Sequence, residues 1–233
     1  MRILVIDVGG SKIKCLLAGD TERRTAPTGT AYTPTNFVAD VRTLLDGAGY
    51  DRVTIGFPAP IKSGRIAKEP VNLGPGWMDF DYRSAFGCGV KFVNDAAMQS
   101  VGSYQGGRMM FLGLGTGLGT ALIDNSHLIA LEAAHLPYKK RRTFEQWVGN
   151  AAKVRLGKRV WRVEVARVCD IFRRTFLPDY IVLGGGNSKE LRELPAGTRL
   201  GDNSLAFAGG MRVWDTEWDR SVPELPECAP HAP

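Results

Sequence analysis

Residues 2–17 read RILVIDVGGSKIKCLL, and this stretch decides the fold of the chain. Residues 2–8 are mostly apolar and β-branched, which predicts a buried strand that carries the carboxylate of Asp7 near its end. Gly9 and Gly10 permit a tight turn in which backbone N–H groups can point at an anion. A second strand follows, so the stretch predicts a β-hairpin rather than the strand–helix unit of a dinucleotide fingerprint or the longer spacing of a Walker loop. An ordinary hairpin, with glycines for geometry alone, is the alternative.

The bulk composition is that of a globular protein. The chain has 233 residues, 44% hydrophobic and 23% charged, which is enough for one domain or for two small ones. No apolar run approaches the roughly 20 residues of a membrane span, and no signal peptide precedes the first strand, so a cytoplasmic protein is expected. The four cysteines lie far apart without a C-x-x-C pair, which argues against zinc and disulfide frameworks.

The net charge of +6 is concentrated in one part of the chain. Twelve lysines and arginines lie between residues 139 and 174, starting with the run Lys139–Arg142. Such a block is most often a solvated helix face, although it can also attract a polyanion such as nucleic acid or an inorganic phosphate chain. Few aromatic residues are interleaved with these basic residues, and the chain has no RNA-binding signature and no clear helix-turn-helix, which disfavours nucleic acid as a partner.

Strands and helices alternate after the hairpin. Apolar residues recur at helical spacing over 37–45, with Thr35 or Asn36 as the expected N-cap, and a strand follows at 52–57. A second short strand ends at Asn94-Asp95 and continues into a helix over 96–104. This alternation predicts a mixed α/β sheet, at whose carboxyl edge ligand clefts form. Asn-Asp is also a good helix N-cap and needs no catalytic role for that.

A second glycine-turned hairpin lies about 100 residues after the first. Residues 109–124 read MMFLGLGTGLGTALID, in which four glycines in seven residues are costly for a strand interior. Further along, 143–153 and 159–175 read as two helices broken at Leu156-Gly157, and residues 178–189 read as a strand that enters a triple-glycine turn. A last strand and helix are expected over 197–200 and 203–214.

Five ordered segments together resemble the ROK family (repressors, open reading frames, kinases) of the actin/hexokinase-like superfamily, and in particular its polyphosphate-glucokinase branch. They lie at 7–14, 56–77, 94–95, 115–135 and 184–189. The resemblance implies a two-lobed α/β fold of the actin-like, ribonuclease H-like ATPase kind, with mixed sheets, flanking helices and an interdomain cleft. We expect an N-terminal lobe over 1–105, a C-terminal lobe over 106–214 and a flexible tail over 215–233, which is rich in Pro, Glu and Asp.

The resemblance also implies a sugar kinase that moves a phosphoryl group from polyphosphate or ATP to a hydroxyl of a hexose, with glucose as the default. Asp95 would accept the hydroxyl proton as general base, and Asp7 would organise Mg²⁺ through water. The residues expected to bind the sugar are Asn94, Pro58, Ala59, Asn72, Glu132 and His135. Those expected to bind the donor are Asp7, Gly9, Gly10, Ser11, Lys12, Gly115, Thr116, Gly117, Gly184 and Gly185.

Two departures leave alternatives open. Ala134 stands where the family's Glu-x-Gly-His segment has glycine, which puts the conformation of that loop in doubt. The zinc motif of many ROK members is absent, as in the polyphosphate-glucokinase branch. Ala134 leaves a different acceptor open, such as an amino sugar or a cyclitol. The sequence also does not decide between polyphosphate and ATP as the donor, or whether the chain forms a homodimer, as ROK kinases often do. The rival is a non-catalytic sugar-binding regulator or scaffold, although ROK repressors carry an N-terminal DNA-binding bundle and this chain begins at the phosphate hairpin.

Overall fold

The computed structural model describes residues 1–226, which form two compact units. Unit 1 comprises Met1–Asp95 and the segment from Gly210 onward, and unit 2 comprises Ala96–Gly209. The chain passes between the units at the first residue of α3 (Asp95–Ser103) and again inside α6 (Leu205–Arg212). The predicted lobe boundaries were 105 and 214, so the first crossing comes earlier and the end of the last helix belongs to unit 1. In residues 1–226, no helix is long and apolar enough to cross a membrane.

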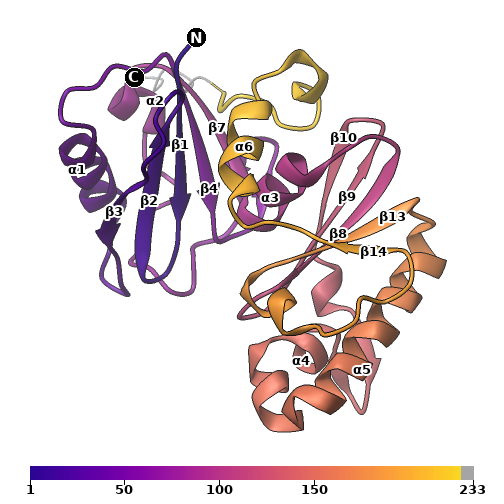
Figure 1. The fold of residues 1–233 in the computed structure, drawn as a ribbon. Coiled ribbons are helices and arrows are strands. Elements are labelled where there is room, and N and C mark those ends of the chain that lie inside the picture. The colour runs from indigo at the N-terminus through magenta and orange to yellow at the C-terminus, as the bar shows by residue number, and fades with distance from the viewer. Residues whose placement is uncertain (227–233) are drawn as a thin grey trace. The chain divides into compact units, whose positions relative to one another are not determined.

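Unit 1 is built on a five-stranded mixed sheet of order β3-β2-β1-β4-β7 (Figure 1). Its strands are β1 (Ile3–Val8), β2 (Lys12–Leu17), β3 (Arg24–Pro27), β4 (Arg52–Phe57) and β7 (Gly89–Asn94). The hairpin β1–β2 and its extension β3 are antiparallel, whereas β1, β4 and β7 are parallel. The central strand β1 is buried on both faces, as its continuous apolar run predicts. The expected hairpin and mixed sheet are thus confirmed.

Helices and a small hairpin complete unit 1. They are α1 (Pro34–Leu45), α2 (Tyr82–Phe86), β5 (Ile61–Lys62) and β6 (Arg65–Ile66). The N-cap of α1 is Thr33, two residues before the earlier of the two expected positions, because Pro34 occupies the first helical position and Asn36 closes a capping box with Thr33. Trp77 is fully buried and packs on Phe57, with ring centroids 5.0 Å apart.

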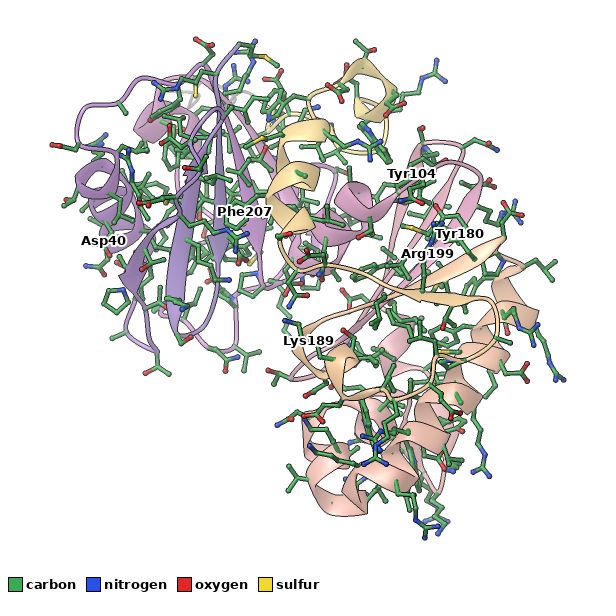
Figure 2. The ribbon with its side chains drawn as sticks, viewed as in Figure 1. Asp40, Tyr104, Tyr180, Lys189, Arg199 and Phe207 are labelled. Carbon is green, nitrogen blue, oxygen red and sulfur yellow. The ribbon has the colours of Figure 1, made fainter. Side chains whose placement is uncertain are left out.

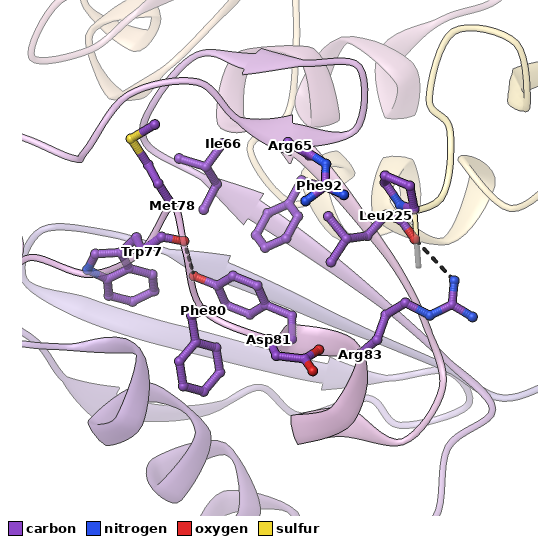
Figure 3. Close-up of a pocket in the computed structure, with 11 residues that line it drawn as sticks. Arg65, Ile66, Trp77, Met78, Phe80, Asp81, Arg83, Phe92 and Leu225 are labelled. Atoms are coloured by element: carbon purple, nitrogen blue, oxygen red, sulfur yellow. Dashed lines mark hydrogen bonds between the residues drawn. The ribbon is translucent and has the colours of Figure 1, made fainter. Parts of the chain in front are cut away.

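The segment after residue 214 packs on unit 1, although a loose tail was expected there. It contains η3 (Thr216–Trp218), and the side chains of Trp218, Val222 and Leu225 are buried. Arg83 Nη1 donates to the Leu225 carbonyl at 3.1 Å beside a cavity of about 20 Å³ (Figure 3). The rest of the expected tail, residues 227–233, lies outside the described residues.

A buried lysine fixes the start of this segment. Lys91, on β7, is 1% exposed, and its ammonium donates to the Val213 carbonyl and to Asp219 Oδ1, both at 2.8 Å. It also lies 4.7 Å from the ring centroid of Trp214. Because a buried ammonium needs partners, these contacts hold the segment to the sheet.

Unit 2 repeats the sheet topology of unit 1, in the order β10-β9-β8-β13-β14 (Figure 1). Its strands are β8 (Arg108–Leu114), β9 (Leu118–Asp124), β10 (His127–Leu131), β13 (Tyr180–Gly184) and β14 (Thr198–Leu200). Three antiparallel strands are again followed by parallel ones. Arg199 lies over the ring of Tyr180, 3.6 Å from its centroid, on neighbouring strands (Figure 2).

Helices and short connections complete unit 2. These are η1 (Ala133–His135), β11 (Pro137–Lys139), β12 (Arg142–Thr143), α4 (Glu145–Val148), α5 (Asn150–Phe176) and η2 (Gly186–Glu190), besides α3 and α6. The predicted helix break is confirmed, since Gly157 interrupts α5 with φ 75° and ψ 154°. The contact of α3 with α6 is backbone to backbone, because a Cβ atom on Gly209 would lie 2.7 Å from the amide nitrogen of Gly102.

Candidate active site

The first glycine turn joins β1 to β2, and hydrogen bonds fix the backbone of Gly9. Gly9 N donates to the Lys12 carbonyl at 3.0 Å, and the Gly9 carbonyl accepts a hydrogen bond from Thr28 Oγ1 at 2.7 Å. Within residues 1–226, the N–H groups of Gly10 and Ser11 donate no hydrogen bond. Adjacent unengaged N–H groups in a glycine turn form the kind of concavity that binds anions.

Asn72 lies against this turn. A Cβ atom on Gly10 would lie 3.0 Å from Asn72 Cβ, so a side chain at position 10 would crowd the Asn72 loop. The structure therefore brings together a residue expected at the sugar and a residue expected at the donor. Trp77, five residues further along the same segment, is buried in the core of unit 1.

The strand register brings the other unit 1 candidates to the same sheet edge. Asp7 pairs with Gly56, and Phe57 pairs with Asn94, so β1, β4 and β7 end side by side. The Pro58-Ala59 loop continues β4, and Asp95 is the first residue of α3. Asp7, Pro58, Ala59, Asn94 and Asp95 therefore lie at the carboxyl edge of these strands, where ligands bind in open α/β sheets. Lys12 instead begins β2, and Asn72 lies in the later loop that contacts Gly10.

Asp7 is paired with a lysine. Lys14 Nζ donates to Asp7 Oδ2 at 2.5 Å across the hairpin, in the ladder pair Asp7–Lys14. Residues 1–226 contain no group of three or more His, Cys, Asp or Glu side chains placed to hold a metal ion. A single carboxylate fits the way in which Mg²⁺ is usually bound, through one or two carboxylates, water and the phosphates of the substrate.

The second glycine turn, between β8 and β9, is held in the same manner. Asn150 N donates to the carbonyls of Gly115 and Thr116 at 3.2 and 3.1 Å, and Asn187 Nδ2 donates to the Gly115 carbonyl at 2.9 Å. In the described part of the chain, the N–H groups of Thr116 and Gly117 donate no hydrogen bond. The two turns, far apart in sequence, thus have their carbonyls engaged and successive N–H groups left for a ligand.

Glu145 lies against the second turn and was missed by the sequence analysis. Its Oε2 accepts a hydrogen bond from Leu118 N at 3.3 Å, and a Cβ atom on Gly117 would overlap the same oxygen. Its signal was its place in the sequence, five residues before Asn150, whose backbone N–H also binds this turn. A Cβ atom at position 117 would therefore displace the end of the flexible Glu145 side chain.

The triple-glycine segment packs beside the second turn. Gly184 pairs with Gly113, and a Cβ atom on Gly185 would lie 2.8 Å from Leu114 N and overlap the Leu114 carbonyl oxygen. Gly185 N donates to Asn203 Oδ1 at 3.2 Å. The structure therefore brings the two predicted donor segments of unit 2, Gly115–Gly117 and Gly184-Gly185, to one end of its sheet.

Glu132 and His135 form an exposed pair. His135 Nε2 lies 3.5 Å from Glu132 Oε2, with both side chains more than half exposed. Between them Ala134 is buried in η1, an ordinary 3₁₀ turn, so the replacement of glycine by alanine is accommodated without a left-handed backbone. Thr120 Oγ1 anchors the loop by accepting from Ala133 N at 3.2 Å.

The basic segment at 139–142 is partly neutralised. Lys139 Nζ contacts the 3%-exposed Glu164 at 2.6 Å, and Arg167 Nη1 contacts the same carboxylate at 2.9 Å. Burial alone would raise the pKa of Glu164, but the hydrogen bonds and charges of Lys139, Tyr138 and Arg167 outweigh it and lower the pKa. Lys139 is therefore a structural cation, whereas Lys140 and Arg141 form the exposed turn of the β11–β12 hairpin.

Sequence comparison finds polyphosphate glucokinases, whereas no protein-family model matches the chain. The *Mycobacterium leprae* enzyme is 24% identical over 208 residues, which cover 79% of this chain and 63% of that protein. The *Mycobacterium tuberculosis* H37Rv enzyme is 26% identical over 208 residues, covering 79% and 77%. The chain thus spans less than two thirds of the *M. leprae* relative.

Solved structures share the fold. The inorganic polyphosphate/ATP-glucomannokinase of *Arthrobacter* sp. strain KM matches with a TM-score of 0.75 and 23% identity, over 90% of this chain and 96% of that one. A ROK glucokinase from *Streptomyces griseus*, solved with glucose and AMPPNP, matches with a TM-score of 0.66 and 17% identity, over 90% and 98%. The predicted fold class is therefore confirmed. The chain is a sequence relative of the polyphosphate glucokinases and has the fold of the ROK-family sugar kinases.

Proposed function

We propose that this protein is a sugar kinase that transfers a phosphoryl group from polyphosphate or ATP to a hydroxyl of a hexose, glucose by default. The observation that carries the proposal is the shared construction of the two glycine turns. In each, side chains and backbone amides engage the carbonyl oxygens, and two successive N–H groups are left for phosphate oxygens. The names of the sequence relatives, polyphosphate glucokinases, support the donor and the acceptor.

Phosphoryl transfer needs positioning and charge stabilisation more than covalent help from the protein. In the proposed reaction, Gly9, Gly10, Ser11 and Lys12 bind donor phosphates in unit 1. Gly115, Thr116 and Gly117 do so in unit 2, and Gly184 and Gly185 lie beside them where a nucleotide would bind. N–H groups that are already oriented stabilise the negative charge that spreads over the phosphoryl oxygens in the transition state.

Asp95 is the proposed general base. The hexose hydroxyl gives its proton to this carboxylate as its oxygen forms a bond to the terminal phosphorus, and the bond to the remaining phosphate chain breaks. Asn94, Pro58, Ala59, Asn72, Glu132 and His135 are the proposed sugar ligands. Asp7 would hold Mg²⁺, which neutralises donor charge when bound.

The test is a coupled assay of the wild-type protein with ATP and with polyphosphate against a panel of hexoses at several salt concentrations. We expect sugar-dependent turnover with at least one donor. A polyphosphate KM that rises steeply with salt would identify a donor held mainly by charge. Absence of transfer from both donors across the panel would overturn the proposal. If a sugar nevertheless raised the melting temperature, the rival sugar-binding regulator would be favoured.

A further inference from the structure

The side chain of Asn187 connects Lys153 to the second glycine turn by hydrogen bonds. The Lys153 ammonium donates a short hydrogen bond to Asn187 Oδ1, and the amide nitrogen of Asn187 donates to the Gly115 carbonyl at 2.9 Å. The same nitrogen lies 3.5 Å from Asn150 Oδ1. Four groups from three segments therefore meet at the carbonyl side of the turn.

A lysine ammonium can only donate hydrogen bonds. Lys153 therefore fixes which end of the Asn187 amide faces it, and the NH₂ group is left to hold the Gly115 carbonyl. In addition, the ammonium places a full positive charge one amide group away from a turn whose N–H groups are proposed to bind phosphate. Such a charge strengthens anion binding most where solvent is partly excluded.

Two more cations of α5, which lie beyond the break at Gly157, also contact η2. Lys158 Nζ lies 2.7 Å from Glu190 Oε2, and Arg162 Nε donates to the Glu190 carbonyl at 2.7 Å. We call Lys153, Lys158 and Arg162 the α5 cation row. One carboxylate, that of Glu190, faces three cations, so the row keeps a net positive charge beside η2. The same short helix carries a further cation, Lys189 (Figure 2).

The β11–β12 turn is the competing basic surface. Lys139 of this turn is already paired with the buried Glu164. In the described part of the chain, no hydrogen bond joins Lys140 or Arg141 to Gly115 or Thr116. The α5 cation row, in contrast, begins at a residue that is bonded to the turn through Asn187.

We propose that the α5 cation row, starting at Lys153, binds the phosphate groups that follow the transferred one in a polyphosphate donor. This inference rests on the proposed function and deepens it by assigning the donor chain to one surface. Lys153 binds the phosphates nearest the turn, and Lys158 binds groups that only a longer chain reaches. Short and long donors should therefore respond differently to the two lysines.

The test compares Lys153→Gln and Lys158→Gln with the matched double variant Lys140→Gln/Arg141→Gln, which removes charge from the competing turn. We expect Lys153→Gln to raise KM about tenfold for both tripolyphosphate and long polyphosphate, the equivalent of about 1.4 kcal/mol, with a smaller change in kcat. Lys158→Gln should raise KM for the long chain only. Both variants should lower the salt dependence of KM, and Lys153→Arg should restore much of the donor affinity.

Two further measurements distinguish a loss of polyphosphate binding from unfolding of the variant and from a failure of the proposed kinase activity. Melting temperatures within about 2 °C of wild type exclude unfolding as the cause, and the KM for sugar should not change. Direct binding of polyphosphate, measured by calorimetry, tests the row even if the wild type shows no turnover. Unchanged polyphosphate affinity in Lys153→Gln and Lys158→Gln, or an equal loss in the Lys140/Arg141 variant, would overturn the assignment.

Discussion

Replacing Gly185 by Ala tests whether the close packing of the triple-glycine segment on Leu114 keeps the second glycine turn in its conformation. Gly185 has φ 78° and ψ 161°, a backbone region used almost only by glycine, in which other residues cost about 1–3 kcal/mol. The added Cβ atom would also lie 2.8 Å from Leu114 N and overlap the Leu114 carbonyl oxygen, so backbone must move. Overpacking of this kind costs a further 1–3 kcal/mol or so. Since Leu114 directly precedes the second turn, the displacement should also weaken donor binding.

The two costs add to at least about 2 kcal/mol, which corresponds to a fall in melting temperature of at least about 4 °C for a protein of this size. Calorimetry of the variant measures the fall, and steady-state kinetics measures the donor KM, which should rise. Gly186→Ala is the matched control, because no atom lies within 4 Å of its added Cβ and its φ is not positive. It should stay within about 0.5 kcal/mol of wild type. Equal melting temperatures for the two variants would refute the reasoning.

Two further predictions concern unit 1 and the buried thiols. Lys91→Met keeps the length of the side chain but leaves the Val213 carbonyl unpaired, so the free energy of unfolding should fall by about 1–3 kcal/mol in denaturant titrations; stability equal to wild type would show that Lys91 does not hold the C-terminal segment. Burial raises the pKa of both Cys15 and Cys169 from 9.0 to about 12. Because these values lie above those of the unfolded chain, both thiols should resist alkylation in the native protein, and the stability they contribute should be present below pH 9.0 and be lost as the pH rises toward 12; rapid native-state alkylation of either would contradict this.

Local patterns predicted the parts of the fold that depend on neighbouring residues. The two glycine-turned hairpins, the Asn94-Asp95 junction and the break at Gly157 follow from alternation, glycine content and strand length within short windows. Each of these features is confirmed in the structure. The roles of the site residues stay predictions, because they concern chemistry that no contact in the structure demonstrates.

Contacts between distant residues were not predictable. The segment after residue 214 is rich in polar residues and proline, but Lys91, more than 120 residues earlier, binds it. The pairing of Lys153 with Asn187 likewise joins residues 34 positions apart. The effect of Ala134 was open in the sequence, since only the backbone of η1 shows that the position needs no glycine. In each case the deciding term is tertiary packing rather than local propensity.

The most direct test of the central claim is turnover of Asp95→Asn, with sugar affinity measured in parallel by calorimetry. Loss of a general base typically costs 10²–10⁴-fold, so we expect turnover to fall by at least about a hundredfold while the sugar Kd stays within a few-fold of wild type and the melting temperature is retained. An Asp95→Asn variant that phosphorylates the sugar at close to the wild-type rate would contradict the account.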